Sequence, residues 1–251
     1  ASRYHTKKLK EQVGVKVSSM MVTKRDGTKE PVSLDKITNR VSVLSTGLSI
    51  DPIVVAQKAI PGLYNDITST EIDNYLAETS AALTVEHPDY SNLAARIKSN
   101  ALHKLTPGFV IATKNLFEDG LLHESYYNKV MQNAEEIESI IDYDRDYSFD
   151  YFALTTLIRA YLLKFENQTI ERPQDLWMRV ALTVSGKEFK LSKLKETYDS
   201  LSNGLYTHAT PTLFNSGLKM QQLSSCFLIG MEDDSIEGIF NTIKDCALIS
   251  K

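Results

Sequence analysis

The stretch VTKRDGTKEPVSLDKI, residues 22–37, decides how the chain begins to fold. Within it, two short extended runs flank Asp26-Gly27, a dipeptide that favours positive φ at both central turn positions. We therefore predict a β-hairpin over residues 21–32. Ser33 follows at the position of an N-cap, ahead of apolar residues that recur at helical spacing. This order predicts a two-stranded ribbon that leads directly into an amphipathic helix.

Helices continue the pattern after the ribbon. Asp51-Pro52 supplies a cap followed by proline in the first turn of a helix. Thr68 and Glu71 have the spacing of a capping box, which predicts the start of another helix. The apolar stripe of that helix is expected to contain Ile72, Tyr75, Leu76, Thr79 and Leu83. Pro107-Gly108 ends the last helix of the series. The first unit, residues 21–108, is therefore expected to be a hairpin with about four helices, a plausible size for a small domain.

The rest of the chain divides into further segments. We expect a helical connector over residues 109–142 and a second helical unit over residues 143–206. From residue 207 the pattern is loop, strand and helix, with LSSCFLIGM (residues 223–231) as the strand. Residues 1–20 are polar and basic and are expected to form a loose N-terminal extension. The helix after the predicted strand carries an apolar face made by Ile236, Ile239, Phe240, Ile243 and Ala247.

The composition is that of an ordinary globular protein, with 42% hydrophobic and 24% charged residues. No segment approaches the roughly 18 uninterrupted apolar residues that a membrane span requires. The formal net charge of -4 argues against bulk nucleic-acid affinity, so we expect neither a nucleic acid nor a membrane as a partner. Two cysteines make no disulfide framework, and with no secretory leader the expected compartment is the reducing cytoplasm.

Several cations of the first unit are candidates for binding a polyphosphate. Lys24, Arg25 and Lys36 lie in the opening stretch, and Lys104 comes much later in the same unit. Cations and helix N-termini are the groups that a triphosphate requires. Taken singly, each of these side chains is more often a solvated surface charge. The chain has neither a GxxxxGK loop nor a GxGxxG fingerprint, which excludes a P-loop or Rossmann site at the level of motifs.

The order of the motifs resembles a known family. VTKRDGTKEPVSLDKI, ITSTEID and HPDYSNLAARI are similar to the ATP-cone of the class I ribonucleotide reductase large subunit. YDRDYSFDYF, ERPQDLWMRV, THATPTLFNSG, QLSSCFLIGMEDDSIEGI and CALISK resemble the part of that subunit that follows the cone. The resemblance covers roughly residues 21–251. It implies a mainly α protein with a small β-hairpin in an N-terminal ATP-cone, then a helical domain that leads into the first elements of a ten-stranded α/β barrel over residues 207–251.

The resemblance implies an activity site in the cone that takes ATP or dATP, with Mg, as allosteric effector. Asp73 suits this role because a carboxylate accepts hydrogen bonds from ribose hydroxyls, while cations meet the phosphates. Without the resemblance, Asp73 would be expected to be a solvated helical carboxylate. Ser69 stands where many relatives have threonine, which keeps the hydroxyl. The residues implied are Lys24, Arg25, Glu30, Pro31, Val32, Ser33, Leu34, Asp35, Lys36, Ser69, Asp73 and Lys104.

Two further sites are implied near the end of the chain. Thr210 and Ser225 match positions that hold the diphosphate of a ribonucleoside diphosphate substrate. Asp234 and Glu237 have capping-box spacing, so Asp234 is also expected to cap the last helix. The allosteric specificity site, where an effector nucleotide selects the substrate base, is implied for Asp234, Ser235, Ile236 and Lys251.

Cys226 has two opposed readings. A lone cysteine in an apolar run is most often a buried core residue. The resemblance reverses this expectation, because it makes Cys226 one of two thiols that reduce the substrate and close to a disulfide, the second lying beyond residue 251. Cys246 matches no catalytic position and is expected to be buried in a core.

The implied activity is that of a ribonucleoside-diphosphate reductase, which makes 2'-deoxyribonucleotides by radical chemistry. The implied partners are a small subunit that holds the metal-containing radical cofactor, thioredoxin or glutaredoxin, and a second copy of the large subunit in a homodimer. The chain lacks the radical cysteine, so it is expected to be inactive alone and to hold no metal itself. The alternatives are a stand-alone ATP/dATP-sensing module and a split-gene fragment that needs a second polypeptide. A cone-containing repressor would carry a zinc ribbon with CxxC pairs, and the sequence has none.

Overall fold

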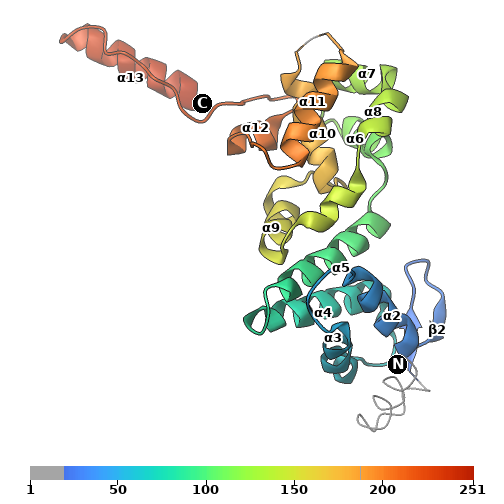
Figure 1. The fold of residues 1–251 in the computed structure, drawn as a ribbon. Helices are drawn as coiled ribbons and strands as arrows, with labels where there is room; N and C mark the ends of the chain where they lie inside the picture. Colours follow the sequence, from blue (N-terminus) through green and yellow to red (C-terminus); the bar gives the residue numbers. More distant parts are fainter. Residues whose placement is uncertain (1–19, 187) are drawn as a thin grey trace.

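The computed structural model describes residues 20–186 and 188–251 (Figure 1). Its first element is the predicted hairpin, in which β1 (Met21–Thr23) pairs antiparallel with β2 (Lys29–Pro31). A third strand, β3 (Ile67–Thr68), lies parallel to β1 on its other edge, so β1 is the middle strand of a small sheet. The predicted N-terminal extension falls almost wholly on residues 1–19, which lie outside the described residues.

The turn of the hairpin differs in detail from the prediction. Gly27 has positive φ, at 81°, and Asp26 does not. The Gly27 amide donates to the Lys24 carbonyl at 3.0 Å, so the two central residues of this turn are Arg25 and Asp26, and the Asp26 carboxylate accepts from the Thr28 amide at 2.9 Å. The expectation of positive φ at Asp26 is therefore wrong, because the turn is centred one residue earlier than the Asp-Gly dipeptide suggested.

The helices of the first unit begin where the caps were predicted. Ser33 accepts from the Lys36 amide, and Asp51 accepts from the Ile53 amide. Thr68 and Glu71 form a complete capping box. The elements are α2 (Leu34–Leu44), α3 (Pro52–Ala59), η2 (Ile60–Gly62), α4 (Ser69–Ala82), η3 (Leu83–Val85) and α5 (Asp89–Leu105).

One hydrophobic core joins this sheet to its helices. It contains Val22 from β1, Val41 from α2, Leu76 from α4 and Leu93 from α5, and all four are buried. Tyr75 was expected on the apolar stripe of α4, yet it is exposed and lies over Gly62, where a Cβ would collide with its hydroxyl. The local pattern thus predicted the packed face of α4 with this one error.

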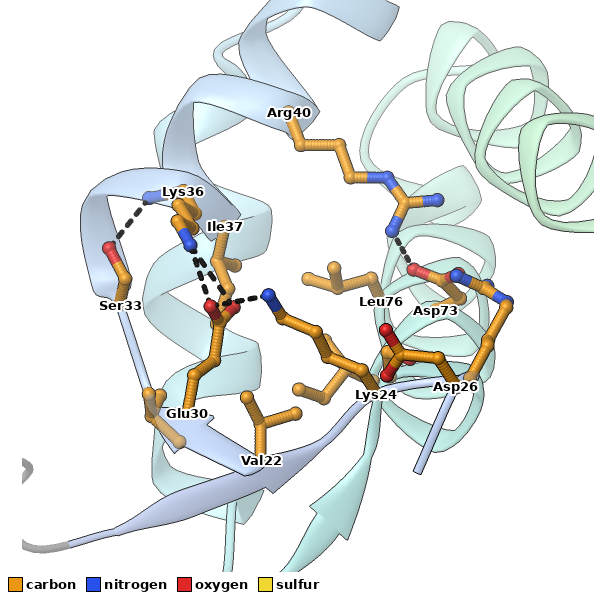
Figure 2. Close-up of a pocket in the computed structure, with 14 residues that line it drawn as sticks. Val22, Lys24, Asp26, Glu30, Ser33, Lys36, Ile37, Arg40, Asp73 and Leu76 are labelled. Atoms are coloured by element: carbon orange, nitrogen blue, oxygen red, sulfur yellow. Dashed lines mark hydrogen bonds and ion pairs between the residues drawn. The ribbon is translucent and has the colours of Figure 1, made fainter. Parts of the chain in front are cut away.

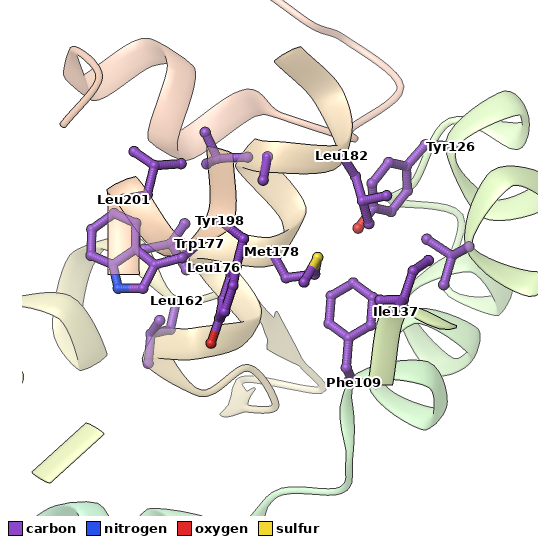
Figure 3. Close-up of a cluster of buried hydrophobic side chains, with 14 of the residues drawn as sticks. Phe109, Tyr126, Ile137, Leu162, Leu176, Trp177, Met178, Leu182, Tyr198 and Leu201 are labelled. Carbon is purple, nitrogen blue, oxygen red and sulfur yellow. The ribbon is translucent and has the colours of Figure 1, made fainter. Parts of the chain in front are cut away.

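A second core is built around α10 (Pro173–Val184), which is buried along almost its whole length (Figure 3). Phe109 and Ile137 reach it from the segment expected to be a connector, and Tyr198 reaches it from α11 (Leu191–Ser202). A helix that is buried on all sides must be apolar on all sides or pair its polar groups. Its neighbours are α6 (Phe109–Glu118), α7 (Glu124–Gln132), α8 (Ala134–Ile140), η4 (Tyr143–Ser148), α9 (Tyr151–Thr156), η5 (Leu157–Tyr161), β4 (Lys164–Phe165), β5 (Gln168–Thr169) and α11 (Leu191–Ser202).

Arg179 is the largest of the α10 side chains whose exposed fraction is below 2%. Its guanidinium binds Glu171 through Nε at 2.6 Å and Nη2 at 3.1 Å, and Nη1 donates to the Ser216 carbonyl at 2.8 Å. A buried arginine needs such pairing because an unpaired charge in a core is very costly. The pair therefore attaches the end of α12 (Thr210–Asn215) to the second core.

The last part of the chain departs from the prediction. Residues 223–231 form no strand, and α13 (Ile236–Ser250) projects away from the helical body (Figure 1). The helix itself was predicted, but its apolar face is exposed, as are Cys226 and Cys246. The predicted strand and the predicted burial of Cys246 are therefore wrong for the described chain. A strand needs a paired strand for its N–H and C=O groups, and no other strand lies beside this run in the described residues.

No helix in the described part of the chain has the length and apolar character needed to cross a membrane.

Candidate functional site

A cavity of about 440 Å³ opens in the first unit between the hairpin, α2 and the start of α4 (Figure 2). Each of these elements depends on a local signal in the sequence. The hairpin depends on the Asp-Gly turn, α2 on the Ser33 cap, and α4 on the Thr68 capping box. The cavity therefore forms where three locally specified elements meet. Its lining consists of Val22, Lys24, Arg25, Asp26, Glu30, Val32, Ser33, Lys36, Ile37, Arg40, Ser69, Ile72, Asp73 and Leu76.

The lining is divided between apolar and charged side chains. Val22, Ile37 and Leu76 are core residues that present an apolar wall to the cavity. Charged groups stand at its rim and on the α4 side (Figure 2). An apolar wall with a few placed polar groups is the usual make-up of a small-molecule site.

Asp73 lies at the charged side of the cavity, and its side chain is fully buried. It accepts from Arg25 Nη2 at 2.5 Å and also from Arg40 Nη1. A buried carboxylate requires such partners because burial removes its hydration. The reading of Asp73 as a solvated helical carboxylate is thus wrong.

Arg40 is a cavity residue that the sequence argument missed. It follows Lys36 by four positions on α2, and residues four apart lie on the same helix face. That spacing was the signal available in the sequence. Among the described residues, Arg40 Nε is buried and has no hydrogen-bond partner, so this guanidinium is incompletely satisfied beside the cavity.

Glu30 connects the cations of the hairpin and α2. Its carboxylate lies 2.7 Å from Lys24 Nζ and 3.0 Å from Lys36 Nζ. Hydrogen bonds from Lys24 and then Lys36 lower the pKa of Glu30, and the hydrogen bond to Glu30 raises the pKa of Lys24. The shared carboxylate of Glu30 therefore holds both lysine side chains at the cavity.

Lys104 comes from the end of α5 and does not line the cavity. Partial burial, followed by the charges of Arg40 and Arg25, lowers the pKa of Lys104, while Asp73 opposes this effect. Of the cations that were predicted to converge, Arg25 is thus close enough to Lys104 to influence its pKa. Three residues of the predicted set face elsewhere: Leu34 is buried in the core, and Pro31 and Asp35 are exposed.

Within the described residues, the site residues predicted near the end of the chain do not meet at one cavity as most of those of the first unit do. Thr210 is the first residue of α12, and its Oγ1 lies 3.5 Å from Tyr161 Oη. Ser225 Oγ lies 3.6 Å from Cys226 Sγ, and both residues are exposed. Thr210 and Ser225 stand on separate segments, with no hydrogen bond between them in the described structure.

The cap of α13 also differs from the prediction. Ser235, not Asp234, is the N-cap, and its hydroxyl accepts from the Gly238 amide at 3.0 Å. The expected capping box of Asp234 and Glu237 is therefore wrong, because the helix starts one residue later than the spacing suggested. Asp234, Ser235 and Ile236 are exposed, as is Lys251 at the last position.

Comparisons with known proteins assign two domains to the chain. The model of the ATP cone domain matches residues 20–105, which include every residue that lines the cavity. The model of the ribonucleotide reductase all-alpha domain matches residues 147–221.

Curated relatives match nearly the whole chain. A ribonucleoside-diphosphate reductase large subunit of Dictyostelium discoideum is 46% identical over 94% of this chain and 29% of its own length. Large chain 2 of this enzyme from Saccharomyces cerevisiae is 46% identical over 92% of this chain and 28% of its own length. The Arabidopsis thaliana large subunit is 46% identical over 92% of this chain and 30% of its own length. The chain thus spans less than a third of the length of these relatives. The chain carries an ATP cone domain and a ribonucleotide reductase all-alpha domain, and over 92–94% of its length it is similar to ribonucleoside-diphosphate reductase large subunits.

Proposed function

We propose that the chain is the N-terminal, effector-sensing part of a ribonucleoside-diphosphate reductase large subunit, and that its cone cavity binds ATP or dATP. The observation that carries this proposal is the cavity itself, in which an apolar wall, a cluster of cations and a buried, doubly paired carboxylate occur together. This combination supports a ligand with a flat apolar base, hydroxyl groups and several negative charges.

The residues fit the three parts of such a nucleotide. The side chains of Val22, Ile37 and Leu76 offer an apolar surface for the base. Asp73 can accept hydrogen bonds from ribose hydroxyls, since a carboxylate has more acceptor sites than its two arginines use. Lys24 and Lys36 can meet phosphate oxygens near the first turn of α2, whose free N–H groups also favour anions. Mg would come with the phosphates, and the described residues include no group of three or more metal-binding side chains.

The proposed roles at the other end of the chain follow the family. Residues 207–251 would open the α/β barrel, with Thr210 and Ser225 at the substrate diphosphate and Cys226 as a redox thiol. Asp234, Ser235, Ile236 and Lys251 would belong to the specificity site. The whole enzyme would work as a homodimer with a radical-generating small subunit and a thioredoxin-type reductant. We propose the cytoplasm as its compartment, in keeping with the two free cysteines.

A stand-alone sensing role is the second candidate. It is supported by the position of the cavity, since all its lining residues lie within the segment of one core, between Val22 and Leu76. In that case nucleotide binding would need no second polypeptide, whereas reduction of a ribonucleotide would.

Calorimetric titration of the chain with ATP and dATP tests the proposed site. We expect both to bind, and we expect Lys36→Ala to weaken binding about tenfold, since a hydrogen bond to a charged group contributes about 1.5–3 kcal/mol. Lys58→Ala is the matched control, because Lys58 also pairs with a glutamate in the same unit, Glu86, but lies away from the cavity. Absence of heat with either nucleotide would contradict the proposal. The chain should not convert CDP.

A further inference from the structure

One face of α5 connects the cone to the all-alpha domain. Ser99 Oγ donates to the Asp146 carbonyl at 2.9 Å, and His103 Nε2 lies 2.7 Å from Asp146 Oδ2. Asp146 belongs to η4 and is fully buried, and its other oxygen accepts from Gln174 Nε2 of α10 at 3.1 Å. The η4 segment is therefore held between the last helix of the cone and the central helix of the second core.

Asn100 lies on the same face and bonds in two directions. Its Oδ1 accepts from Arg40 Nη2 at 2.9 Å, and its Nδ2 donates to Tyr147 Oη at 3.3 Å. Because Arg40 also binds Asp73, three consecutive contacts lead from the cavity to η4. They run from Asp73 to Arg40, from Arg40 to Asn100, and from Asn100 to Tyr147.

The chemistry of Arg40 makes this connection sensitive to what happens in the cavity. A guanidinium is planar and presents its donors in a rigid fork, so a movement that serves Nη1 also moves Nη2. A ligand that forms a hydrogen bond with Asp73 or with the unpartnered Nε of Arg40 must therefore change the geometry of the hydrogen bond between Arg40 and Asn100. The amide of Asn100 transmits such a change because its oxygen faces the cone and its nitrogen faces η4.

We infer that Asn100 and Tyr147 are positioning residues for Arg40, and that this chain of contacts couples the occupancy of the cone cavity to η4 and α10. The nature of the ligand rests on the proposed function, whereas the contacts themselves do not. Coupling between two sites is reciprocal in free energy. If ligand binding changes the free energy of the contact between Asn100 and Tyr147, loss of that contact must therefore change the free energy of ligand binding by the same amount.

The first test needs no nucleotide. In the whole chain, Arg40→Lys keeps a cation for Asp73 but loses the fork that reaches Asn100. Amide hydrogen exchange over residues 143–148 should become about fivefold faster, the effect expected for loss of one net hydrogen bond. Arg96→Met is the control, since Arg96 donates to the Leu44 and Thr46 carbonyls inside the cone and has no bond to η4 in the described structure. Unchanged exchange in Arg40→Lys, or equal changes in both variants, would overturn the inference.

The second test measures the coupling with ATP as the probe. In the wild-type chain, ATP should change exchange over residues 143–148. Tyr147→Phe removes only the hydroxyl that Asn100 bonds, and it should abolish this change and shift the ATP dissociation constant about threefold to fivefold. Tyr127→Phe is the control, because Tyr127 lies on α7, stacked on Phe117, and its hydroxyl has no hydrogen bond to Asn100 or to η4 in the described structure.

The outcomes separate the two proposals. A Tyr147→Phe variant that binds ATP like the wild type, with the same ATP-dependent exchange, would overturn the coupling while leaving the nucleotide site intact. A wild-type chain that binds no ATP would instead overturn the proposed function, and the exchange of Arg40→Lys would still decide whether Arg40 is linked to η4.

Discussion

The cone cavity and residues 221–251 were assigned from the same kind of evidence, motifs in a familiar order, yet they differ sharply in structure. In the cone, Asp73 is fully buried and paired with two arginines. In the terminal segment, Cys226 and Asp234 are exposed, and the run that was expected to be a strand is irregular. Motifs thus predict site residues in both regions, but within the described residues most of the predicted residues of the cone meet at a cavity, whereas those of the terminal segment are exposed.

The contrast follows from where the contacts of each region come from. Strand β1 finds its partners β2 and β3 inside the same unit, and the caps of α2 and α4 are made by adjacent residues. In the part of the chain that the structure describes, two side chains of α12 bond to the start of the terminal run: Thr212 donates to the Leu223 carbonyl, and Asn215 donates to the Gln222 carbonyl. Beyond these bonds the run has little to pack against in the described chain.

The largest expected effect compares one leucine from each region. Leu93 is completely buried in the cone core, whereas Leu228 is fully exposed. Leu93→Ala should lower the free energy of unfolding by about 2–5 kcal/mol, the usual cost of emptying a core site. Leu228→Ala should change it by less than about 0.5 kcal/mol. Urea denaturation of both variants measures this, and similar losses would mean that the terminal run is packed after all.

A smaller effect is expected for the acidic residues. Asp73→Ala leaves Arg25 and Arg40 without their shared counter-charge, and it should cost about 2–3 kcal/mol of unfolding free energy. This lies below the value for a fully buried pair, because the two arginines are 27% and 24% exposed. Asp234→Ala, on an exposed residue, should have almost no effect. Equal losses of unfolding free energy for Asp73→Ala and Asp234→Ala in the same denaturation experiment would contradict the difference in burial between the two regions.

The last comparison concerns the rate at which thiols react with a reagent, which reports exposure without a change in the free energy of unfolding. Cys226 and Cys246 should both react with a thiol reagent in the native chain, at rates close to those in the unfolded chain. Ser80→Cys provides the comparison, because Ser80 is completely buried on α4 and a thiol there should be protected. If Cys226 or Cys246 were protected as well, the exposure of the terminal segment would be contradicted.

The sequence alone was sufficient for features that a few neighbouring residues decide. The hairpin at Asp26-Gly27 and the starts of α2, α3 and α4 agree with the prediction, because turns and caps depend on contacts over two or three positions. The same reasoning placed Lys24, Arg25 and Lys36 on elements that meet at the cavity.

Only the tertiary structure decided which of these residues are buried and what they touch. The pairing of Asp73 with Arg40, the third strand on β1 and the bonds from Asn100 to Arg40 and Tyr147 join positions that are distant in sequence. The tertiary structure also decided that Cys246 is exposed, although its helix has a clear apolar face. Local spacing shows which side chains share a face, but burial depends on whether another element of the fold covers that face.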